Sequence, residues 1–132
     1  TKKNPFKNKS YLNLKKRIKL AKKISLKNKF IKVRFFESKI KSNKTVDLIS
    51  HLKKKGKSTE IYFIMGADNL INFHKWHRWN EIASKSILLV FNRGKYKTKS
   101  LKSITYKKYN NLRLKFINFK KINISSSKLR KI

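Results

Sequence analysis

Apolar residues recur along this chain with two different spacings. Over residues 11–24 they lie about one helical turn apart, with lysines on the opposite side, which predicts an amphipathic helix. Residues 30–36 alternate apolar and basic side chains, which predicts a strand. A second helical pattern predicts a helix over Thr45–Lys55, capped by Thr45 and ending at Gly56.

The second half of the chain alternates short apolar runs with helical patterns. Residues 60–65, 87–91 and 114–119 predict strands, and the first of these is apolar enough for a sheet covered on both faces. Residues 67–73 and 76–84 predict two short helices, and residues 95–111 predict a loop with a weak helix. The alternation predicts an α/β protein with a mostly parallel sheet, as one domain over residues 1–132.

The charge of the chain is strongly one-sided. Its 132 residues include 38 basic and five acidic ones, a formal net charge of +33, which is typical of nucleic-acid binding. Only six of the basic residues are arginine, however, and Asn, Ile, Phe and Tyr are also abundant. A/T-rich codons encode this set, so we interpret most of the charge as a lysine-covered surface. Nonspecific polyanion binding is still expected, and a basic RNA- or ribosome-associated domain remains the alternative.

Other function classes are limited by composition. The chain has no cysteine, which excludes disulfides and thiolate metal sites. No apolar run approaches the length of about 20 residues that crosses a bilayer. No signal peptide is visible, and we expect a cytoplasmic protein without a membrane partner. The oligomeric state is not predicted.

A candidate ligand site follows the strand expected over residues 60–65. Gly66 ends the apolar run, and a glycine lets a ligand approach the main chain closely. Asp68 could accept a hydrogen bond from a ribose hydroxyl or help to order a metal-bound phosphate, and the alternative is that it caps a helix. Trp76 and Trp79, three residues apart, would share a helix face, either in the core or with one ring stacked on a ligand.

Histidines and serines suggest two further sites. His74 and His77 are three apart, but a zinc site needs three or four ligands, so we assign no metal site; His51 is expected at the surface. Ser125, Ser126 and Ser127 cluster where a last helix is expected to start. Free amides, the helix dipole and Arg130 would make an anion site there, with a plain serine cap as the alternative.

These residues together resemble one family, the bacterial nicotinate-nucleotide adenylyltransferases. The resemblance runs over nearly the whole chain, and the blocks over residues 66–79 and 124–130 are more specific together than either is alone. The positions that carry the resemblance are Pro5-Phe6-Lys7, Arg17, Thr45, Phe63 to Leu70, Phe73, Trp76, Trp79, Arg93 to Tyr96, and Ile124 to Arg130.

The resemblance implies a Rossmann-like nucleotidyltransferase fold and transfer of AMP from ATP, with Mg²⁺, to nicotinate mononucleotide in NAD biosynthesis. Trp76 would stack on the nicotinate ring, and Thr45 with the backbone amides around Trp76–His77 would hold its carboxylate. Gly66 and Asp68 would contact nucleotide. The ATP phosphates would be bound by Lys7, Ser125, Ser126, Ser127 and Arg130.

The chain departs from the family pattern at its beginning. The Gly-Gly-x-Phe-Asp-Pro-x-His-x-x-His type of motif, whose histidines stabilise the transferring phosphate, is absent, and Phe6 stands where histidine is usual. We therefore expect an N-terminally truncated domain that lacks its first strand–helix unit, has no assigned catalytic residue and is nearly inactive alone. A degenerate homologue that keeps the fold without catalysis is a further alternative.

Overall fold

The computed structural model describes residues 12–92 and 94–118, which form two compact units. Residues up to Ile61 and the segment Trp76–Lys85 make the first unit. Residues Tyr62–Lys75 and those from Ser86 onward make the second. The single domain expected from the sequence stays a prediction.

The first unit is helical. It contains α1 (Leu14–Ser25), α2 (Thr45–Lys55) and α4 (Trp79–Lys85). Helix α1 starts at Asn13, whose side chain accepts a hydrogen bond of 2.8 Å from the Lys16 amide, so that one open helix donor is satisfied. Helices α2 and α4 pack together and bury apolar side chains. The buried apolar residues of this unit are Val46, Ile49, Ile82 and Ala83.

The sequence prediction for the first unit is right about both long helices and wrong about the strand. Helix α2 has the predicted bounds, and α1 is displaced by a few residues. Residues 31–36 form neither a helix nor a strand, and the side chain of Phe30 is 85% exposed. A strand exists only with a hydrogen-bonded neighbour. The described sheet consists of three other strands, so the alternating pattern here has no partner.

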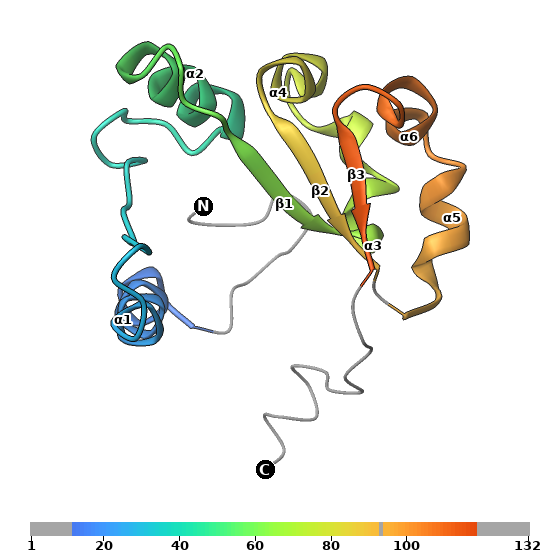
Figure 1. Cartoon of the computed structure of the whole chain (residues 1–132). Helices are drawn as coiled ribbons and strands as arrows, with labels where there is room; N and C mark the ends of the chain where they lie inside the picture. Colours follow the sequence, from blue (N-terminus) through green and yellow to red (C-terminus); the bar gives the residue numbers. More distant parts are fainter. Residues whose placement is uncertain (1–11, 93, 119–132) are drawn as a thin grey trace. The chain divides into compact units, whose positions relative to one another are not determined.

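The second unit is built on a parallel sheet (Figure 1). Strands β1 (Tyr62–Gly66), β2 (Ile87–Phe91) and β3 (Leu114–Ile117) lie side by side in that order, with both pairs parallel. The short helices are α3 (Ala67–Leu70), α5 (Lys97–Leu101) and α6 (Ile104–Tyr109), with 3-10 turns at Phe73–Lys75 and Gly94–Tyr96. The expected α/β class with a parallel sheet is therefore confirmed.

The core of the second unit lies on one face of this sheet. Met65, Leu88, Val90 and Leu114 are buried from the strands, and Phe73 is fully buried. Tyr62 and Ile64 are 47% and 63% exposed, so the expectation that β1 is covered on both faces is wrong. Strand β1 is an edge of the described sheet, and its side chains alternate between core and solvent.

One further difference concerns short elements. The weak helix expected over residues 95–111 is two helices, α5 and α6, and Ser103 caps α6 by accepting a hydrogen bond from the Tyr106 amide at 3.2 Å. None of the helices in residues 12–92 and 94–118 has the length and apolarity needed to cross a bilayer.

Candidate active site

The carboxyl ends of the three strands form one row at the edge of the sheet. Gly66 is in register with Phe91, and Phe91 is in register with Ile117. In parallel sheets this edge is where ligands bind, because the loops that follow the strands gather there. The register confirms that Gly66 is the last residue of a strand. It lies at the carboxyl end of the sheet, where the sequence predicted a ligand site.

Asp68 lies just beyond this row, in the first turn of α3. The residue that caps α3 is Gly66, with φ −80° and ψ 156°, so the alternative of Asp68 as a helix cap is wrong. Its carboxylate is half-buried, and a negative charge in the first turn is favoured by the amides that point out of a helix start. Asp68 therefore offers a carboxylate at the edge of the sheet.

Trp76 and His77 are in a turn that leads into α4. The backbone of Arg78 is left-handed, with φ 50°, and the carbonyl of Trp76 accepts a hydrogen bond of 3.2 Å from the Trp79 amide. The expectation that Trp76 and Trp79 share a helix face is therefore wrong, because α4 begins only at Trp79. Left-handed backbone at a residue other than glycine is uncommon and recurs at functional sites.

Thr45 is the first residue of α2 and is buried, with 9% of its surface exposed. It was expected to cap the helix, but the cap is Lys44, without a side-chain hydrogen bond. The preceding turn is closed by Ser42, whose hydroxyl donates to an Asp47 carboxylate oxygen at 2.6 Å and accepts from the Lys44 amide at 3.1 Å.

A hollow of about 890 Å³ adjoins this start of α2. Glu37, which is 4% exposed, and Asp47 contribute carboxylates to its wall, and Lys41 and Lys44 contribute amines. The remaining wall residues are Ser38, Ile40, Ser42 and Asn43. The amides of the first turn of a helix have no carbonyl partner within the helix, so a negatively charged ligand group is favoured at this end.

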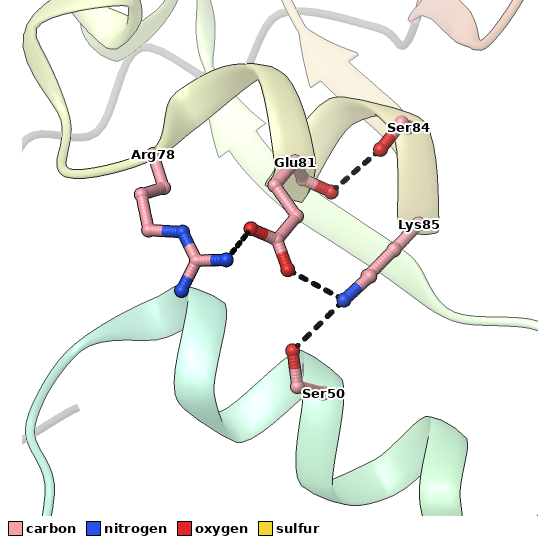
Figure 2. A network of polar contacts seen from close by, with 5 residues as sticks. All are labelled: Ser50, Arg78, Glu81, Ser84 and Lys85. Carbon is pink, nitrogen blue, oxygen red and sulfur yellow. Dashed lines mark hydrogen bonds and ion pairs between the residues drawn. The ribbon is translucent and has the colours of Figure 1, made fainter.

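A polar network joins α2 to α4 (Figure 2). Glu81 is paired with Arg78 on one side and with the Lys85 amine, at 2.5 Å, on the other. The Lys85 amine also donates to the Ser50 hydroxyl on α2 at 3.1 Å. The hydrogen bond from Lys85, followed by the charges of Arg78 and Lys85, holds the pKa of Glu81 below its ordinary value, against the opposing effect of burial.

This lowered pKa predicts how a substitution depends on pH. A folded-state pKa below the unfolded value of about 4.5 adds stability that is present above pH 4.5 and lost as the pH falls through the folded pKa. Glu81→Gln should therefore melt at a lower temperature than the parent chain at pH 7, with the difference shrinking below pH 4.5. Thermal melts of both proteins from pH 3 to 7 measure the difference in melting temperature. A salt concentration of 1 M should reduce this difference, because the ion pairs of Glu81 are partly exposed.

The histidines do not gather into a metal site. Within residues 12–92 and 94–118 no three side chains of His, Cys, Asp or Glu could hold an ion together. His51 was expected at the surface, but it is half-buried with its ring 5.7 Å from the Phe36 ring. The helical pattern missed this contact because Phe36 belongs to the loop before α2.

The remaining expected site residues lie outside the described residues. These are Lys7, Ser125, Ser126, Ser127 and Arg130. Thr45, Trp76 and His77 belong to the first unit and Gly66 and Asp68 to the second. A single cleft formed by Gly66, Trp76 and Ser125 therefore stays a prediction.

Sequence reasoning missed the hollow before α2 and the network around Glu81. One signal was available, since the chain has only five acidic residues. Three of them, Asp47, Asp68 and Glu81, lie in the first turns of α2, α3 and α4. Because acidic residues are so rare in this chain and are favoured at helix starts, their positions could have directed attention to the turns that precede these helices.

Sequence comparison identifies relatives over the full chain. The cytidylyltransferase-like family matches residues 1–132. A probable nicotinate-nucleotide adenylyltransferase of Pelagibacter ubique is 67% identical over 132 residues, which cover all of this chain and 73% of that protein. One of Aliarcobacter butzleri with the same name is 33% identical over 100 residues, 75% of this chain and 55% of that protein.

Solved structures agree on the fold. The nicotinic acid mononucleotide adenylyltransferase of Plasmodium falciparum complexed with NaAD has a TM-score of 0.61 at 22% identity, covering 95% of this chain and 63% of its own. The same enzyme complexed with APC has a TM-score of 0.62 at 21% identity, covering 86% and 59%. The chain thus has the nucleotidyltransferase fold, and it belongs to the cytidylyltransferase-like family and, within it, to the nicotinate-nucleotide adenylyltransferases.

Proposed function

We propose that this chain transfers AMP from ATP to nicotinate mononucleotide, releasing pyrophosphate and forming nicotinate adenine dinucleotide for NAD biosynthesis. The observation that carries this proposal is the 67% identity with the Pelagibacter relative over all 132 residues. The row of strand ends at Gly66, Phe91 and Ile117 supports it, because nucleotides bind at this edge of α/β sheets. The basic RNA-binding alternative is not favoured.

The contacts to the acceptor nucleotide are proposed residue by residue, as the resemblance assigns them. Trp76 would stack on the nicotinate ring, and Thr45, at the positive end of α2, would hold the ring carboxylate together with the amides around His77. Gly66 and Asp68 would contact the nucleotide beyond the end of β1. The ATP phosphates are assigned to Lys7, Ser125, Ser126, Ser127 and Arg130, whose amine, hydroxyl and guanidinium groups suit phosphate oxygens.

Magnesium is proposed to enter with ATP. Mg²⁺ is usually held by one or two carboxylates together with substrate phosphates, so a preformed protein cage is not needed. Asp68 is the described carboxylate at the edge of the sheet, and this donor fits such an ion. When bound, the ion would neutralise phosphate charge; the chain would position the two nucleotides for in-line attack. A cytoplasmic location stays a prediction of the sequence.

Ligand binding to the 132-residue chain tests this function without requiring turnover. Nicotinate mononucleotide should quench the fluorescence of the two tryptophans in a saturable titration. Nicotinamide mononucleotide, which lacks the carboxylate, should bind more weakly because Thr45 and its neighbouring amides would lose an anionic partner. Thr45→Val, which removes the hydroxyl and keeps the shape, should reduce the preference for nicotinate.

Salt separates this site from the general positive charge. Heparin binding should weaken steeply between 50 and 500 mM salt. Many contacts between lysines and heparin sulfates would form, and each releases counterions. Binding of nicotinate mononucleotide, a small ligand in a shaped site, should change far less. Tight, salt-resistant RNA binding together with no response to nicotinate mononucleotide would contradict the proposed function.

A further inference from the structure

The network around Glu81 lies between the two segments that carry the proposed nicotinate contacts. Helix α2 begins at Thr45, and the turn Trp76–His77 directly precedes α4. In Figure 2 the two helices run in the same direction, with Arg78 at the start of α4 on the side where α2 begins. Whatever sets the register of α2 against α4 therefore sets Thr45 against Trp76.

Apolar packing gives this register no directional contact. The contact between the helices buries Val46 and Ile49 from α2 and Ile82 and Ala83 from α4, four side chains without a directional group. Apolar burial is proportional to the area removed from water and is itself non-directional. A hydrogen bond between the helices, by contrast, has a narrow range of distance and angle.

Lys85 supplies such a bond. Its amine donates to Ser50 at 3.1 Å while Glu81 holds it at 2.5 Å from one turn earlier in the same helix. Arg78 contacts the other side of Glu81, which connects the left-handed residue after His77 to the network. The side chains of Lys85 and Glu81 are 38% and 23% exposed, so these pairs add little to stability. The pairs therefore matter more for the placement of α2 against α4 than for the free energy of unfolding.

We propose that Lys85, held by Glu81 and bonded to Ser50, is a positioning residue for the acceptor nucleotide. It fixes α2 against α4 so that Thr45 and Trp76 face the same ligand. This rests on the proposed function for the identity of the ligand. A shift of about 1 Å in a positioned group costs up to about a hundredfold in an enzyme site, so a bond of small stability has a measurable effect on binding.

Variants at both ends of the bond test this role. Lys85→Met removes the amine and keeps an unbranched chain that matches the lysine side chain up to its amine, and Ser50→Ala removes the acceptor. Each should weaken nicotinate mononucleotide binding about three- to tenfold, and the double variant should be no weaker than the worse single one, because both remove one interaction. ATP affinity should stay within about twofold. Lys85→Arg, which keeps a donor, should recover most of the loss.

Lys54→Met is the matched control, since Lys54 is an exposed lysine on α2, the helix that carries Ser50. It should leave binding unchanged. Equal loss of affinity for ATP and for the acceptor, or an effect of Lys54→Met as large as that of Lys85→Met, would show a merely structural or electrostatic effect and overturn the positioning role. Unchanged acceptor binding in Lys85→Met would overturn it as well.

A second measurement does not depend on the ligand. In a Trp79→Phe background Trp76 is the single tryptophan, and its fluorescence reports its own surroundings. Lys85→Met should increase acrylamide quenching of Trp76, with the same change for Ser50→Ala and none for Lys54→Met. If quenching responds in this way but the parent chain does not bind nicotinate mononucleotide, the proposed function fails and the coupling stands. Quenching that does not respond to Lys85→Met overturns the coupling itself.

Discussion

Trp76→Ala is expected to weaken binding of nicotinate mononucleotide by about tenfold while the fold is kept. Stacking of an aromatic face on a positively charged pyridinium ring contributes roughly 0.5–2 kcal/mol, which corresponds to about 2- to 30-fold in affinity. Trp76 lies in the turn before α4, outside any helix, so its removal leaves the helix intact. Isothermal titration calorimetry measures the affinity without relying on the lost fluorophore.

Conservative variants sharpen this test. Trp76→Phe keeps an aromatic face and should retain part of the affinity. Trp79→Phe alters the other tryptophan, which lies within α4, and should retain nearly all of it. If Trp79→Phe loses the affinity and Trp76→Ala keeps it, the ring contact has been assigned to the wrong tryptophan.

Phe73→Ala is expected to cost about 3–5 kcal/mol of unfolding free energy in the second unit. The side chain of Phe73 is 0% exposed, and its ring lies 5.9 Å from the Phe63 ring of β1, so truncation leaves a cavity beneath the sheet. Since the unfolding free energy of a typical domain is about 5–15 kcal/mol, this loss is a large part of its stability. Urea denaturation followed by circular dichroism measures it.

Phe30→Ala is the matched control for this substitution. The side chain of Phe30 is 85% exposed, and it belongs to the segment that was expected to be a strand. Its truncation should change the unfolding free energy by less than about 0.5 kcal/mol. A loss at Phe30 as large as the loss at Phe73 would mean that residues 30–36 do pack in a sheet.

Local pattern was sufficient wherever an element satisfies its own hydrogen bonds or is apolar on both sides. Helix α2 and strand β2 have the predicted bounds because Gly56 stops the first and Asn92 follows the second. The strand expected over residues 30–36 is absent because strand pairing depends on a distant neighbour. For the same reason the exposure of Ile64 in β1 was not foreseen.

In the candidate site, too, local pattern predicted some features and missed others. Gly66 could be assigned to a strand end from an apolar run that stops at glycine, and the register of β1 with β2 confirms it. The prediction that Trp76 and Trp79 share a helix face is wrong, because Arg78 has a left-handed backbone and α4 begins only after it. A single backbone angle of this kind leaves no mark in residue spacing.

The sequence by itself determined the α/β class, the family, and the strand end at Gly66. Each depends on residues that are neighbours along the chain, or on short motifs whose residue types and order can be recognised in this one sequence. Only the tertiary structure revealed the hollow before α2, the burial of Glu37 and the bond from Lys85 to Ser50. The two ends of that bond are 35 residues apart, and packing of one helix against another, which no local pattern encodes, brings them together.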